Sequence, residues 1–207
     1  MLAYVFWHRP SVPDRAAEYE DALIAFHRSL ARSLPVGTRA SAVFRVAALP
    51  WLAPVSGPAP GELAAEASAA YEDWYLVEDF AALGVLNEAA VGRGHRTTHD
   101  QAARRYGAGA GGLYGLIEGE PCAESLAGAS LATWIARPPG SHRVGLAEML
   151  GDGMSPDSAS LWRRHLVLGP APEFCLLADE PTAGVAGARL PSGWSATTLA
   201  REALFSG

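Results

Sequence analysis

Residues 71–91 read YEDWYLVEDFAALGVLNEAAV, and the order of elements within this stretch decides the predicted fold. Its first part, residues 71–78, interleaves aromatic and aliphatic residues with acidic ones, which is typical of a β-strand. Asp79 follows as the expected N-cap of a helix that carries Leu83 and Leu86. This stretch therefore predicts a strand followed directly by a capped helix, and the elements on either side are assigned relative to it.

Upstream of this stretch the sequence predicts a strand, a helix and a second strand. Tyr4 to Arg9 is aromatic and β-branched, as strands are, and Pro10 ends it. Ser41 to Leu49 returns to strand character. Between them, Asp14 is expected to cap a helix whose apolar residues recur every three or four positions: Tyr19, Leu23, Phe26, Leu30 and Leu34.

Downstream, the helical pattern resumes from Thr98 to Tyr106, and Gly111 to Glu118 is expected to form another strand. The glycine-rich tract from Gly107 to Gly112 precedes a strand, which is the wrong order for a dinucleotide-binding turn. It is expected to end the helix and turn the chain. The resulting order, β-α-β-β-α-β, is the ferredoxin-like arrangement of helices on one face of an antiparallel sheet.

The second half of the chain repeats part of this pattern. Thr133 to Pro138 (TWIARP) resembles Val5 to Pro10 (VFWHRP), and the segment from Gly119 to Gly128 between the halves is expected to be a linker. Further elements are expected in the same order: a helical segment around Val144 to Leu150 and strands at Trp162 to Leu168, Glu173 to Ala178 and Ala196 to Leu204.

We therefore predict an α+β fold made of two ferredoxin-like halves, residues 1–120 and a degenerate copy at 128–207. Their antiparallel sheets would pack into one α/β barrel within a single globular unit. Chance similarity of two short strands is the competing interpretation.

The strand-to-helix segment from Tyr71 to Val91 resembles the dimeric α/β-barrel superfamily. Its members include antibiotic-biosynthesis monooxygenase-like, muconolactone isomerase-like and stress-responsive barrel proteins. The resemblance implies two sheets closed face to face, with small molecules, and haem in some members, held inside the barrel or between sheet and helices. It carries no functional residue onto this sequence.

Composition excludes several classes of function. The 207 residues carry a net charge of −6, and all sixteen basic residues are arginine, so no lysine serves a Schiff base or a phosphate-binding loop. No basic tract suits a nucleic acid, and apolar runs such as Leu2 to Trp7 are far shorter than the roughly 20 residues that span a membrane. We expect a cytoplasmic protein with no membrane partner, in which Cys122 and Cys175 are free thiols.

Strand alternation gathers polar side chains on one face of the first sheet. His8 shares a face with Tyr4 and Phe6, while Arg45, Asp73 and Tyr75 alternate with more apolar neighbours. The apolar sets, Phe44 with Val46 and Trp74 with Leu76, are expected to cover the helix side. His8, Arg45, Asp73 and Tyr75 would then face the barrel interior.

These residues are the candidate site. As catalytic residues, His8 would accept a proton and Asp73 would fix its tautomer. As ligand-binding residues, Arg45 would hold an anionic oxygen and Tyr75 would donate a hydrogen bond. His165 could join them, although the Arg163–Arg164–His165 run leaves its face open. The alternative is that these polar groups only satisfy one another.

His95 and His99 have the i,i+4 spacing of a metal site, but no glutamate lies between them and glycines flank them. We expect no metal and no cofactor. The predicted function is a small-molecule-binding barrel, with cofactor-independent proton-transfer or oxygenase chemistry as its enzymatic form. A non-catalytic assembly barrel and a haem- or metal-binding barrel are the alternatives, and a homodimer is compatible with each.

Overall fold

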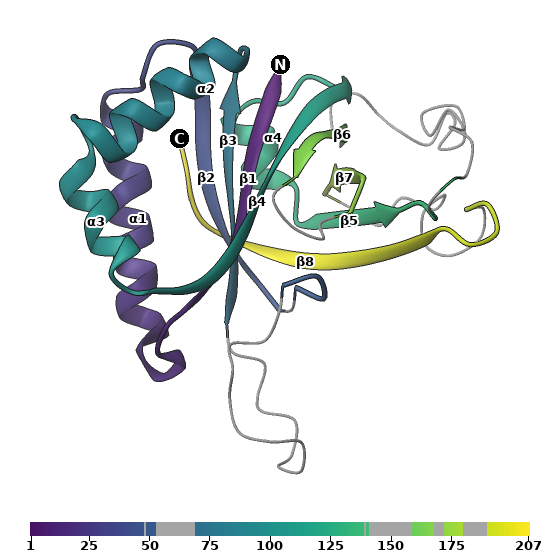
Figure 1. Ribbon diagram of the computed structural model, residues 1–207, viewed down its shortest axis with the longest axis horizontal. Helices are drawn as coiled ribbons and strands as arrows, with labels where there is room; N and C mark the ends of the chain where they lie inside the picture. The colour runs from purple at the N-terminus through teal and green to yellow at the C-terminus, as the bar shows by residue number, and fades with distance from the viewer. Residues whose placement is uncertain (48, 53–68, 139, 141–158, 168–171, 180–189) are drawn as a thin grey trace.

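The computed structural model describes residues 1–47, 49–52, 69–138, 140, 159–167, 172–179 and 190–207. Within these residues eight strands close into a barrel, and three of the helices lie together on one side of it (Figure 1). The strands are β1 (Leu2–Pro10), β2 (Thr38–Val46), β3 (Ala70–Val77), β4 (Tyr106–Glu118), β5 (Leu131–Ala136), β6 (Ala159–Val167), β7 (Phe174–Ala178) and β8 (Ser195–Ser206).

The strand order of the barrel shows its two halves. Around the ring the strands follow one another as β1-β3-β2-β8-β5-β7-β6-β4, and every neighbouring pair is antiparallel. The first half has the order β4-β1-β3-β2 and the second has the matching order β8-β5-β7-β6. This confirms the predicted α+β barrel of two ferredoxin-like sheets. The division at residues 120 and 128, and descent from a repeat, stay predictions.

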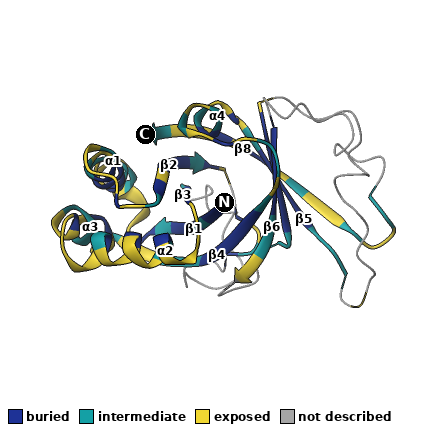
Figure 2. Ribbon diagram, turned by 90° about the horizontal axis from the view of Figure 1, so that it is seen from above, coloured by how far each residue is buried: buried dark blue, intermediate teal, exposed yellow. Residues whose placement is uncertain are grey.

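The first half carries its helices on the outer face of the barrel (Figure 2). A single 3₁₀ turn (Pro13–Arg15) leads into α1 (Ala16–Arg32), so the side chain of Asp14 does not cap α1 as expected. Asp79 does cap α2 (Phe80–Asn87), because its carboxylate accepts the Ala82 N–H at 2.9 Å. A π-helical turn (Glu88–Gly92) and α3 (Arg96–Ala103) follow. None of the described helices is long and apolar enough to cross a membrane.

Two predictions for the middle of the chain are wrong. The expected linker contains a short helix, α4 (Ala123–Gly128), whose Leu126 packs among the residues of the barrel interior. The glycine-rich tract is not a turn but the first half of β4. A Cβ at Gly111 would lie 2.6 Å from the Tyr4 hydroxyl, so glycine gives the aromatic rings of β1 room to lie over β4. The predicted helical segment around Val144 to Leu150 lies outside the described residues.

Aromatic side chains fill the interior of the barrel, called the lumen here. Trp7, Trp74, Trp134 and Trp162 are at most 1% exposed and meet one another at ring-centroid distances of 5.1 to 6.1 Å. One ion pair is buried among them, with Nε of Arg201 3.2 Å from Oε1 of Glu72. The indole N–H groups of Trp7 and Trp74 donate to the same Glu72 carboxylate, so its charge is well solvated by the protein. Both cysteines are free thiols, as expected.

The predicted assignment of the two sheet faces is wrong. Phe44, Trp74 and Leu76 point into the lumen, and His8 and Asp73 lie on the outer face beneath α1. The reason is that both faces of the sheet are buried, since every residue of β3 is buried. The closed lumen takes the bulkiest apolar side chains, whereas α1 supplies polar partners for the outer face.

Candidate functional site

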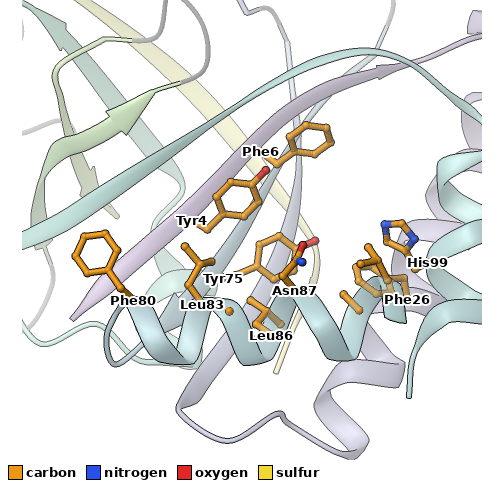
Figure 3. Close-up of a pocket in the computed structure, with 12 residues that line it drawn as sticks. Tyr4, Phe6, Phe26, Tyr75, Phe80, Leu83, Leu86, Asn87 and His99 are labelled. Atoms are coloured by element: carbon orange, nitrogen blue, oxygen red, sulfur yellow. The ribbon is translucent and has the colours of Figure 1, made fainter. Parts of the chain in front are cut away.

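Two adjoining pockets lie between the outer face of β1 and β3 and the helices. The polar pocket has a volume of about 280 Å³ and is lined by His8 and Asp73 among others. The apolar pocket has a volume of about 610 Å³ and lies along α2. Both share Phe6, Phe26, Tyr75 and His99 as lining residues, so they form one crevice. Figure 3 shows the residues that line the apolar pocket. A concave site of this size, apolar with a few polar groups, is typical of small-molecule binding.

Strand register brings the polar groups together. β1 and β3 pair so that Phe6 lies opposite Asp73 and His8 opposite Tyr71, which makes His8 and Asp73 diagonal neighbours on one face. The Nε2 atom of His8 is 3.0 Å from Oδ1 of Asp73, and both side chains are almost fully buried. The predicted pairing of these two residues is therefore present, on the opposite face from the one expected.

Asp73 is shared by two imidazoles and a phenol. Its Oδ2 accepts the Tyr75 hydroxyl at 3.1 Å and lies 3.6 Å from Nε2 of His27. Burial alone would raise the pKa of Asp73, but attraction and hydrogen bonds from His8 and His27 lower that pKa well below its usual range. Asp73 is thus held as a carboxylate. Burial, together with the Asp73 charge, raises the pKa of Tyr75.

His8 is enclosed on its remaining edge and on both ring faces. Its Nδ1 lies 2.7 Å from the hydroxyl oxygen of Tyr19 on α1. The rings of Phe6 and Tyr71 stack on the imidazole with centroid distances of 5.1 and 5.6 Å. Burial and the charge of Asp73 raise the pKa of Tyr19, so this phenol stays protonated. Asp73, His8 and Tyr19 therefore form one continuous hydrogen-bonded chain.

The apolar pocket is built mainly by α2 and the π-helical turn. Phe80, Leu83 and Leu86 come from α2, and Ala90 and Val91 from the turn. Asn87 is the amide among the lining residues, and Figure 3 shows it pointing toward the ring of Tyr75. π-Helical turns are often found at functional sites. The lining contains no arginine, so this part of the crevice suits an uncharged molecule.

Arg45 and His165 do not join the crevice. The Arg45 guanidinium binds the Glu20 carboxylate at 2.6 and 2.8 Å and also pairs with Glu202, which ties β2 to α1 and β8. His165 is exposed on the outer face of β6, with its ring centroid 6.4 Å from that of Phe80 at the edge of the apolar pocket. A register shift between β4 and β6 beside it explains why alternation left its face open.

His95 and His99 have different surroundings in spite of their spacing. Nδ1 of His95 is 2.8 Å from Oγ of Ser29 and its Nε2 is 3.2 Å from the carbonyl oxygen of Ser33, so both ring nitrogens are engaged. His99 packs edge-on against Phe26 and lines the crevice. Among the residues that the structure describes, no three His, Cys, Asp or Glu side chains are grouped to hold a metal ion.

Tyr19 and His27 are site residues that strand alternation does not reveal. The sequence places Tyr19 only on the apolar face of its helix and gives His27 no motif. The helix pattern does point to both residues, because Tyr19, Leu23 and His27 follow one another at intervals of four on one buried helix face. A histidine on such a face requires a polar partner on the element it covers.

Comparisons with known proteins add a structural likeness. No protein-family model and no curated protein matches the sequence. Among solved structures, a "putative monooxygenase" from Lactobacillus acidophilus NCFM superposes with a TM-score of 0.50, over 97% of this chain and 93% of that chain. The likeness is one of fold. At 8% sequence identity it transfers no catalytic residue, but it supports the α+β barrel over almost the whole chain.

Proposed function

We propose that this protein binds a small, largely apolar molecule in the crevice and that the His8–Asp73 pair takes up a proton from it. The observation that carries the proposal is the buried 3.0 Å contact between these residues at the wall of a pocket that continues into a larger apolar pocket. A histidine oriented by a carboxylate is a common general base. The apolar pocket would hold the body of the ligand and present its acidic group to the polar pocket.

The enzymatic form of this proposal is proton transfer without a cofactor. Removing a proton from an O–H or C–H acid leaves an electron-rich anion on the ligand. Reprotonation at another atom isomerises the ligand, whereas electron transfer to dioxygen oxidises the ligand and reduces dioxygen. The resemblance to the dimeric α/β-barrel superfamily and the name given to the structural neighbour agree with either reaction. Membership of that superfamily is part of the proposal.

A non-catalytic assembly barrel is the alternative, and it would be packed solid. The lumen fits that description, because four tryptophans fill it. The crevice outside the barrel does not, and it is the feature that favours ligand binding.

Fluorescence titration with 1-naphthol, an apolar molecule with one acidic hydroxyl, tests the proposal. We expect saturable binding, and Ala90→Phe should weaken it by at least about tenfold, or 1.4 kcal/mol, because the new ring fills the apolar pocket. Arg45→Ala is the matched control, since Arg45 lies outside the crevice. Absence of binding, or equal binding by wild type and Ala90→Phe, contradicts the proposal.

A further inference from the structure

His8 offers a ligand no free hydrogen-bonding atom. Its Nε2 is bound to Asp73, its Nδ1 is bound to Tyr19, and Phe6 and Tyr71 cover its ring faces. A ligand in the polar pocket can therefore exchange a proton with His8 only through one of the groups bound to it. Asp73 already receives hydrogen bonds at both oxygens, from His8 and from Tyr75.

Asp73 is a weak proton acceptor, because its contacts with His8 and His27 lower its pKa well below the usual range, so Tyr19 is the better placed of the two bound groups. In the neutral His8 imidazole that donates its Nε2 hydrogen to the Asp73 carboxylate, Nδ1 keeps its lone pair and the Tyr19 hydroxyl is the donor to it. The Tyr19 oxygen can then accept one more hydrogen bond. Tyr19 also lines the polar pocket, so a ligand there can reach it.

We infer that Tyr19 is a catalytic residue that meets the acidic proton of the ligand and passes a proton on to His8. This inference rests on the proposed function. In the step, the Tyr19 oxygen takes the proton from the ligand while the original hydroxyl proton of Tyr19 moves to Nδ1 of His8. The ligand becomes an anion, Tyr19 ends as a neutral phenol, and His8 ends as an imidazolium beside the Asp73 carboxylate.

The energetics favour a coupled transfer over a free tyrosinate. Burial and the Asp73 charge raise the pKa of Tyr19, so a separate phenolate at this position is costly. In the coupled transfer the positive charge forms on His8, 3.0 Å from the Asp73 carboxylate that attracts it. Proton transfer along Tyr19, His8 and Asp73 therefore leaves the negative charge on the ligand and the positive charge on His8.

Tyr19 also borders a third cavity. This cavity has a volume of about 240 Å³ and is lined by Ser11, Arg15, Arg104 and Arg105 among others. Tyr19 is thus a lining residue of both this cavity and the polar pocket.

The test uses 4-nitrophenol, whose phenol and phenolate forms have different absorption bands, at a pH where the free probe is mainly the phenol. Bound to wild type, the probe should show the phenolate band. Bound to Tyr19→Phe it should show the phenol band, with a dissociation constant within about threefold of wild type, because only one hydroxyl is lost. Tyr71→Phe is the matched control, since Tyr71 also stacks on His8 but its hydroxyl donates to Glu20, and it should keep the phenolate band.

The outcomes separate the two claims. A phenolate band in both wild type and Tyr19→Phe overturns the role of Tyr19 and leaves the proposed function standing. A phenol band or no binding in wild type overturns the proposed function and this inference with it. A second measurement needs no variant: ¹⁵N NMR of wild type should find His8 protonated at Nε2 and unprotonated at Nδ1, and the opposite tautomer overturns the inference.

Discussion

The imidazole of His8 and the carboxylate of Asp73 meet across the diagonal of the β1–β3 ladder, with Nε2 and Oδ1 3.0 Å apart beneath α1. Both residues belong to strands and neither to a loop, so the closed sheet fixes their separation. The crevice opens beside them on the helix side. The barrel is therefore a rigid support for a site on its outside.

Asp73→Asn should lower the free energy of unfolding at neutral pH by about 2 kcal/mol or more, because a buried carboxylate with several donors is lost. The pKa of Asp73 is lower in the folded state than in the unfolded state, so its ionised form stabilises the fold above the unfolded-state pKa of about 4. The difference between wild type and variant should persist down to that pH and shrink below it. Urea unfolding at a series of pH values measures this, and a constant difference down to the lowest pH would refute it.

Gly109→Ala should destabilise the protein by about 1 to 3 kcal/mol, because the new Cβ would lie 2.6 Å from the backbone carbonyl oxygen of Trp7. Gly84→Ala in α2 is the matched control. Its Cβ meets nothing within 4 Å, and alanine should stabilise the helix by about 1 kcal/mol. Thermal unfolding should move the two variants in opposite directions, and a shift of the same sign in both would be inconsistent with the β4 packing.

Trp162→Phe should lower stability by about 1 to 3 kcal/mol, because a fully buried indole in the lumen is replaced by a smaller ring. Its affinity for 1-naphthol should equal that of wild type, since Trp162 lines neither pocket of the crevice. Chemical unfolding and the fluorescence titration measure the two effects. A large loss of affinity in the folded variant would place the ligand in the lumen.

Arg45→Ala should cost at most about 1 kcal/mol of stability, since its side chain is 38% exposed and its ion pairs are screened by solvent. Added salt should reduce the difference from wild type further. Thermal unfolding at low and high salt is the measurement. A loss several times larger that persists in salt would mean that the contact with Glu20 is a structural requirement of the fold.

The sequence was sufficient for the order of the eight strands in the described part of the chain but not for the orientation of the sheet. Alternation separates Asp73 and Tyr75 from Trp74 and Leu76 correctly. Alternation does not say which set faces the lumen, because both faces of the sheet are buried. Helices cover one face, and the opposite sheet covers the other. The lumen takes the face with the bulkier apolar side chains, because four tryptophans fill it. That interior exists only once the second half closes the barrel.

The candidate site was predicted in part for the same reason. His8, Asp73 and Tyr75 meet because they belong to adjacent strands, a relationship that alternation can detect. Tyr19 and His27 come from a helix, and only the packing of α1 on the sheet brings them into contact. Arg45 lies on the same outer face as His8 and Asp73, not in the barrel interior as expected, and Glu20 and Glu202 bind it there.

A crystal structure of the protein with 1-naphthol bound tests the central claim most directly. We predict density for the ring system in the crevice against Phe6, Tyr75 and Leu86, with its hydroxyl directed toward the Tyr19 hydroxyl. Density among the tryptophans of the lumen, or at the surface away from α2, would contradict it.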